Sequence, residues 1–102
     1  MNNKQKAKRS FRASKAWKLF RHKMNVKQKG IDPITLHKLI KGCNLHHRHI
    51  TANEEEYKNM ENEDEYIMLN KKTHDCLHWI FIYWKKDPTI LDRIDDELKK
   101  WH

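Results

Sequence analysis

The apolar residues of this chain fall into short segments whose spacing switches between that of a helix and that of a strand. Residues 12–29 have helical spacing, whereas residues 43–50 and 66–69 have the length and composition of strands. Residues 73–86 and the segment that follows Pro88 again have helical spacing. A chain of 102 residues has room for one small domain with a modest core. The order helix, strand, loop, strand, helix and helix predicts an α+β fold.

The first helix has clear end signals. Ser10 or Ser14 can cap its start, and it is predicted to end before Gly30. Asp32 and Pro33 predict a turn after it. The apolar stripe of this helix consists of Ala13, Trp17, Phe20 and Met24.

The two later helices have similar signals. Asn70 can cap the helix over residues 73–86, and Asp87 can cap the last helix with Pro88 at its first position. The predicted apolar faces are Leu77, Ile80, Phe81 and Trp84 for one, and Ile90, Leu91, Ile94, Leu98 and Trp101 for the other.

Charge is distributed unevenly along the chain. The formal net charge is +8, but residues 1–30 hold eleven Lys or Arg and no acid, whereas residues 54–65 hold seven acids and one Lys. Such a basic segment predicts a polyanionic partner, with DNA as the first candidate. Residues 1–9 have nothing to bury and are predicted to be a disordered arm before a single domain over residues 10–102. A solubilising tail is the alternative interpretation.

Cysteine content and hydropathy give an indication of the cellular compartment of the protein. The two cysteines, Cys43 and Cys76, are too few for a disulfide framework, and free thiols suit a reducing cytoplasm. No apolar run reaches the roughly 18 residues that a membrane-spanning helix needs. The basic N-terminus has no apolar segment behind it, unlike a secretory signal. A cytoplasmic protein without a membrane partner is therefore expected.

Histidines are concentrated in two short stretches. His46 and His47 are adjacent in the first predicted strand, and His74 and His78 are one helical turn apart. Neutral imidazole is a common metal ligand and a ready general base near pH 7. Adjacent residues on a strand point to opposite faces, so His46 and His47 should not bind the same ion. These four residues predict a metal-dependent site.

Five short motifs follow one another along the chain. They are Ser14-Lys15-Ala16-Trp17-Lys18-Leu19-Phe20-Arg21, Asp32-Pro33-Ile34-Thr35, Asn44-Leu45-His46-His47, Tyr57-Lys58-Asn59-Met60 and His74-Asp75-Cys76-Leu77-His78-Trp79. This set resembles the HNH endonucleases and in particular small phage-type HNH proteins, and the resemblance covers roughly residues 10–84. The resemblance implies a ββα-metal (His-Me finger) core, with an N-terminal basic helix and a C-terminal amphipathic helix added to it.

The resemblance also implies a role for each matching residue. His46 and His74 match metal ligands, and His78 matches a third ligand or a group beside the ion. His47 matches the general base that activates water. Glu65 stands where the family has the Asn that orients this base. One divalent ion, magnesium, manganese or zinc, is the implied cofactor.

The implied function is that of a phage or mobile-element DNA endonuclease that hydrolyses phosphodiester bonds with a bound metal. DNA is expected to contact Lys15, Lys18, Arg21 and Arg48. The small size favours a homodimer or a larger phage assembly, and phage origin would mean the host cytoplasm. The alternative is a non-catalytic ββα-metal module that binds DNA or a protein, because Glu65 brings a charge where the family has an amide.

The resemblance bears on the core as well. Many HNH proteins hold a structural zinc with two cysteine pairs, and Asn70 and Thr73 stand where the second pair would be. Cys76 is predicted to be buried and inert. The core is therefore expected to rest on aromatic residues, namely Trp17, Phe20, Trp79, Phe81 and Trp84.

Overall fold

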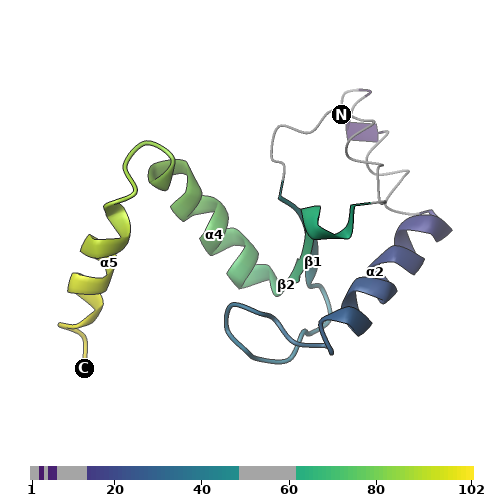
Figure 1. Ribbon diagram of the computed structural model, residues 1–102, viewed down its shortest axis with the longest axis horizontal. Helices are drawn as coiled ribbons and strands as arrows, with labels where there is room; N and C mark the ends of the chain where they lie inside the picture. The colour runs from purple at the N-terminus through teal and green to yellow at the C-terminus, as the bar shows by residue number, and fades with distance from the viewer. Residues whose placement is uncertain (1–2, 4, 7–13, 49–61) are drawn as a thin grey trace. The chain divides into compact units, whose positions relative to one another are not determined.

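A computed structural model describes residues 3, 5–6, 14–48 and 62–102 (Figure 1). Within these ranges the chain forms three α-helices and a two-stranded antiparallel sheet, which confirms the predicted α+β class. The chain divides into two compact units, Met1–Lys71 and Lys72–His102. Most of the predicted arm and acidic residues 54–61 lie outside the described residues.

In the first unit, the helix α2 runs over Lys15–Lys27. Ser14 caps it, because its Oγ accepts a hydrogen bond from the Trp17 backbone N–H at 3.2 Å. The helix ends before Gly30, whose φ of 69° is in the left-handed region that glycine tolerates. The members of the predicted stripe that are described, Trp17, Phe20 and Met24, are all buried.

Asp32 organises the loop that leads from α2 to the sheet. Its side chain is fully buried. Oδ1 accepts hydrogen bonds from the backbone N–H groups of Ile34 and Thr35 at 2.8 and 3.2 Å, which closes the predicted turn. Oδ2 accepts a third from the Asn70 N–H at 2.9 Å. One carboxylate therefore ties this loop to the residue that follows the second strand.

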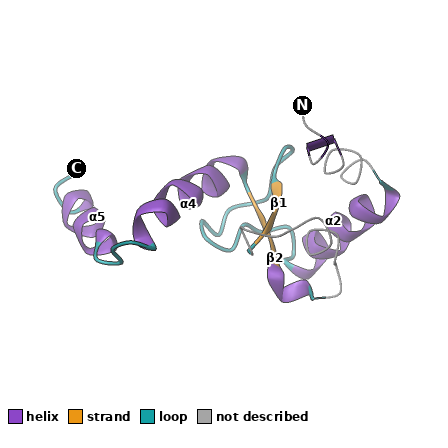
Figure 2. Cartoon of the chain, turned by 90° about the horizontal axis from the view of Figure 1, so that it is seen from above, coloured by secondary structure: helices purple, strands orange, loops and turns teal. Residues whose placement is uncertain are grey.

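The sheet consists of β1 (Asn44–His47) and β2 (Tyr66–Leu69), drawn orange in Figure 2. The strands are antiparallel, with Asn44 opposite Leu69 and His47 opposite Tyr66. A short 3₁₀ helix, η1 (Glu63–Glu65), leads into β2. Both strands lie within the predicted segments.

Two amide side chains attach α2 and the loop to this sheet. The Gln28 side chain accepts a hydrogen bond from Met68 N at 2.7 Å and donates one to Met68 O at 3.0 Å. These are the two bonds that a neighbouring strand would make. The Asn70 side chain accepts from Ile40 N at 2.9 Å and donates to Lys38 O at 3.0 Å.

The core of the first unit lies between α2 and one face of the sheet. Tyr66 is central to it, with edge-to-face contacts to Phe20 at 4.9 Å and to Trp17 at 6.4 Å between ring centroids. A two-stranded sheet is marginal by itself, so this packing is what stabilises it. The whole cluster comprises Trp17, Phe20, Met24, Leu39, Cys43, Tyr66 and Met68.

The remaining helices are α4 (Lys71–Trp84) and α5 (Ile90–Leu98). Asp87 lies in the turn that joins them, where its Oδ1 accepts from Thr89 N at 3.1 Å and its Oδ2 binds Arg93 Nη2 at 2.9 Å. Asp87 therefore closes this turn, and α5 begins slightly later than predicted. No helix among the described residues is both long and apolar enough to cross a bilayer.

The aromatic residues of α4 do not form the core that the sequence predicts. Trp79, Phe81 and Trp84 are 55%, 37% and 41% exposed. Cys76, also predicted to be buried, is exposed. The reason is that α4 carries apolar residues around most of its circumference, so the spacing alone could not identify its covered face.

Candidate metal centre

The two histidines of β1 belong to opposite faces of the sheet. His47 is paired with Tyr66, which lies in the core on the side of α2. Because side chains alternate along a strand, His46, opposite Ile67, belongs to the other face. Both histidines are half-buried. The strand thus separates the predicted ligand from the predicted base.

The second histidine pair comes from the first turns of α4. His74 and His78 are one turn apart, and their ring centroids are separated by 4.3 Å. His74 Nδ1 lies 3.3 Å from Asp75 Oδ1. If this carboxylate accepts the Nδ1 proton, Nε2 of His74 remains as the atom that can bind an ion.

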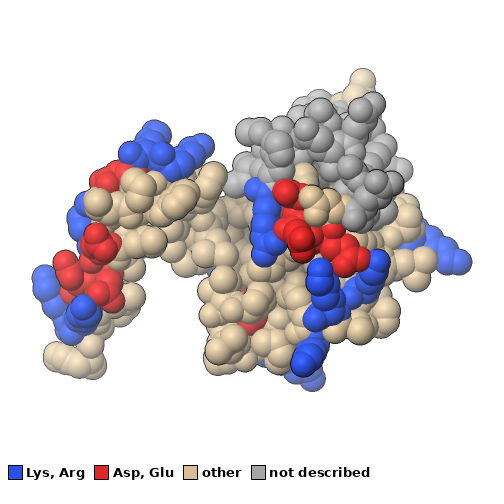
Figure 3. Space-filling model, in the orientation of Figure 1, with Lys and Arg blue, Asp and Glu red and all other residues tan. Residues whose placement is uncertain are grey.

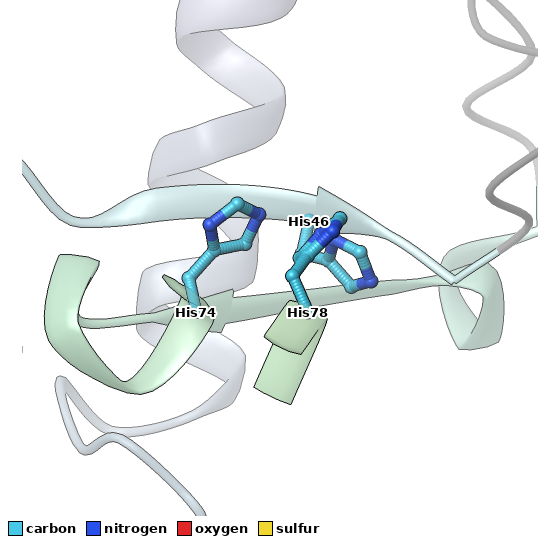
Figure 4. A group of neighbouring side chains, drawn as sticks. All are labelled: His46, His74 and His78. Atoms are coloured by element: carbon cyan, nitrogen blue, oxygen red, sulfur yellow. The ribbon is translucent and has the colours of Figure 1, made fainter. Parts of the chain in front are cut away.

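His46, His74 and His78 form a three-histidine group, shown in Figure 4. Each residue offers one ring nitrogen to the group, and these three nitrogens lie within 4.8 Å of one another. All three residues are half-buried. The three predicted ligands are therefore close enough to hold one metal ion.

The donor set of this group suits a borderline transition metal. Three imidazole nitrogens are the protein ligands of one common class of catalytic zinc site, which leaves the fourth position open. Nitrogens about 2.1 Å from a tetrahedral zinc are about 3.4 Å apart, so small side-chain rotations would bring the three rings into range. Magnesium prefers oxygen ligands. Among the three expected ions, zinc fits the residues best.

The surroundings of His78 favour its neutral form. Partial burial lowers the pKa of His78 below the ordinary value of 6.5, and the neighbouring His74 lowers it further, while the Asp75 charge acts in the opposite direction. A metal binds the neutral imidazole and competes with protons for it. The lowered pKa therefore keeps this ring available as a ligand near neutral pH.

The predicted base and its expected partner lie at the η1 end of the sheet. The His47 ring centroid is 4.8 Å from that of Tyr66, with 32° between the ring planes. Glu65 is the last residue of η1. Its backbone carbonyl accepts a hydrogen bond from Arg48 N at 2.7 Å, so Arg48 and Glu65 face each other next to the His47–Tyr66 pair. His47 is less open to water than the sequence predicts, because Tyr66 and the core occupy its side of the sheet.

The predicted DNA contacts on α2 differ in their surroundings. Lys15 and Lys18 are exposed. Arg21 is half-buried, and its Nη2 donates a hydrogen bond to the Cys43 carbonyl at 3.0 Å. Lys15 and Lys18 are thus open to a phosphate, whereas Arg21 holds the start of β1 against the helix.

Acidic residues of η1 neutralise part of the charge of the basic helix. Figure 3 shows acidic side chains in red next to basic side chains in blue. Glu63 forms ion pairs with Lys23 and, at 3.3 Å, with Lys27. Hydrogen bonds from these two lysines hold the pKa of the Glu63 carboxyl below its usual range. The exposed Arg48, the fourth predicted DNA contact, donates to the Asp64 carbonyl.

Sequence reasoning missed several residues that position these elements. The turn signal at Asp32 predicted the local turn but not the bond to Asn70. Nothing in the spacing indicated that Gln28 would pair with Met68, or that Glu63 would pair with Lys27. Such contacts join residues far apart in the sequence and have no local signature.

No protein-family model matches this chain, nor does any curated protein or solved structure. The resemblance to HNH endonucleases therefore rests on the sequence motifs alone. The function has to be inferred from the site.

Proposed function

We propose that this chain is a metal-dependent DNA endonuclease whose ββα-metal core consists of β1, β2 and α4. The three-histidine group carries the proposal, because it joins His46 to both histidines of the His-x-x-x-His motif. A structural zinc site normally has four protein ligands, whereas this group offers three among the described residues. A three-ligand site leaves a position for water or a phosphate oxygen, as hydrolysis requires.

The residues divide the chemistry of hydrolysis between them. A bound divalent ion supplies Lewis-acid stabilisation of the scissile phosphate and the leaving oxygen. His46, His74 and His78 would hold this ion through neutral imidazoles. His47 accepts the proton of the attacking water as the new P–O bond forms and the bond to the leaving oxygen breaks. Glu65 supplies a hydrogen-bond acceptor that orients the base in place of the family's amide.

Affinity for DNA comes from the basic helix in this proposal. Lys15 and Lys18 are exposed on α2, which has no acidic residue. Lysines bind phosphates without reading sequence, and each contact adds to the salt dependence of binding. The proposed nuclease therefore has little sequence preference of its own.

The test measures zinc binding and plasmid nicking in single-residue variants. His46→Ala and His74→Ala are expected to lower zinc affinity by more than about 100-fold, because each removes a direct ligand. His47→Ala is expected to abolish nicking while zinc binding survives. Glu65→Asn is expected to keep or raise activity, since it removes a negative charge that opposes the approaching phosphate.

His22→Ala is the matched control, because His22 is exposed on α2 and lies outside the three-histidine group. It should change neither zinc affinity nor nicking. Unchanged zinc affinity in His46→Ala would contradict the metal centre. A wild-type chain that binds zinc but nicks no plasmid with magnesium, manganese or zinc, with Glu65→Asn equally inert, would contradict the nuclease.

The second candidate is a non-catalytic module that uses the ion for stability and binds DNA or a protein. The contact between His47 and Tyr66 favours it, because a ring packed on the core side of the sheet is less free to meet water. Zinc binding without nicking is the result that this candidate predicts.

A further inference from the structure

One stripe of α4 combines exposed aromatic rings with lysines. Trp79 and Tyr83 are 55% and 48% exposed, and their ring centroids are 5.0 Å apart. Lys72 precedes Trp79 by seven positions, so it lies on the same side of the helix, and Lys86 follows Tyr83 by three. We call Lys72, Trp79, Tyr83 and Lys86 together the aromatic stripe.

The aromatic stripe belongs to a positively charged segment, whereas the next helix, α5, is negatively charged. Lys72 is in the first turn of α4, and Lys86 follows its last turn. Residues 71–86 hold four Lys and one acid, Asp75, which pairs with His74. Residues 90–98, by contrast, hold four acids and one Arg. A negatively charged ligand is therefore favoured on α4 and opposed on α5.

We propose that the aromatic stripe binds single-stranded nucleic acid, with unpaired bases stacked on Trp79 and Tyr83 and phosphates held by Lys72 and Lys86. Every base presents a π-face, so aromatic side chains between cations bind single strands without needing a particular sequence. Lys72 and Tyr83 are 11 residues apart within α4, or roughly 17 Å at the rise of a helix, and Lys86 follows the end of the helix; this length suits a run of a few nucleotides. Paired bases in a duplex are already stacked and cannot use the rings.

A second copy of this chain is a less suitable occupant. In an antiparallel pair of α4 helices related by a twofold axis, Lys72 of each copy would face Lys86 of the other. In a parallel pair, each lysine would face its own equivalent. Like charges oppose each other in both arrangements, whereas the phosphates of a nucleic acid neutralise them.

This activity goes beyond the proposed hydrolysis and does not involve the three-histidine group. It can therefore be measured in the full-length chain with a chelator present, when no metal-dependent cleavage occurs. Fluorescence anisotropy would compare a labelled 12-nucleotide thymidine strand with a labelled 12-base-pair duplex. Failure of plasmid nicking leaves this measurement unaffected, so the two proposals can fail separately.

Trp79→Ala and Tyr83→Ala are each expected to weaken binding of the single strand by about 5- to 150-fold, the range that the loss of one stacked base produces. Binding of the duplex should change by less than about twofold, because its bases do not reach the rings. Trp79→Phe and Tyr83→Phe should retain most of the affinity. Lys72→Gln and Lys86→Gln should each flatten the log–log salt dependence by about 0.7.

Ile82→Ala is the matched control, because Ile82 is 52% exposed on the same helix and has no ring. It should leave binding of the single strand unchanged. Equal losses for strand and duplex, or no loss in Trp79→Ala, would overturn the proposal. So would a wild-type dimer that Trp79→Ala converts to a monomer in sedimentation, because a second copy would then cover the stripe.

Discussion

His78 is the residue whose ionisation most directly links the candidate metal centre to pH. Its pKa is lowered in the folded chain, first by partial burial and then by His74. Below the ordinary pKa of 6.5 the unfolded chain therefore binds more protons at this position than the folded chain, and acidification favours unfolding. This contribution to stability is complete above pH 6.5 and is lost as the pH falls through the lowered value.

We predict that the metal-free wild type loses more thermal stability than His78→Gln between pH 7.5 and pH 5. The variant lacks the titrating ring, so it should show a flatter dependence. Circular dichroism melts with a chelator present give the comparison. Parallel curves for the two proteins would mean that burial does not perturb this ring.

Asp32 is the single residue on which the loop before the sheet depends most. Its buried carboxylate accepts three backbone hydrogen bonds, from Ile34, Thr35 and Asn70. Asp32→Ala is expected to destabilise the fold by about 2–4 kcal/mol, because three backbone N–H groups lose their shared acceptor. Asp32→Asn should cost about 1–2 kcal/mol, because an amide can still accept at one atom. Urea unfolding would measure both, and equal values would show that the oxygen retained in Asp32→Asn contributes nothing to stability.

At the scale of the elements, α2 holds the two-stranded sheet together. Phe20 is 7% exposed and packs edge-on against Tyr66, whereas its neighbour Leu19 is 59% exposed. Phe20→Ala is therefore expected to lower the free energy of unfolding by about 3–4 kcal/mol. Leu19→Ala, the matched control on the same helix, should cost less than about 0.5 kcal/mol. Similar losses in denaturant titrations would mean that α2 does not form the core as described.

At the scale of the whole molecule, charge is balanced by contacts between distant segments. Glu63 holds Lys23 and Lys27, which then contribute less to binding DNA. Glu63→Gln is expected to raise affinity for DNA and to steepen the log–log salt dependence by about 0.9 for each lysine that gains a phosphate contact. Fluorescence anisotropy on a labelled duplex over a range of salt concentrations would measure both changes.

Asp96→Asn is the matched control for this prediction. Asp96 is exposed on α5, and its substitution changes the net charge by the same amount. It should raise DNA affinity less than Glu63→Gln and leave the salt dependence nearly unchanged. If the two variants behave alike, only net charge matters and the ion pairs of Glu63 have no effect of their own.

The sequence by itself determined the features that depend on neighbouring residues. A serine cap at Ser10 or Ser14, the strand segments, the turn at Asp32 and the one-turn spacing of His74 and His78 follow from backbone preferences and from the repeat of a helix. The order of the elements follows from the same local information. Local preferences and spacing were therefore sufficient to predict the α+β class and to single out the histidines, whereas the role of each histidine was implied by the family resemblance.

Only the tertiary structure decided which surfaces are buried and which charges meet. Trp17 and Trp79 both lie in segments whose apolar residues have helical spacing, yet the first is 4% exposed and the second 55%. Lys18 remains exposed on α2, whereas Lys27 is paired with Glu63. These outcomes depend on packing and electrostatic contacts between segments that are distant in the sequence, and helical spacing contains no information about the partner.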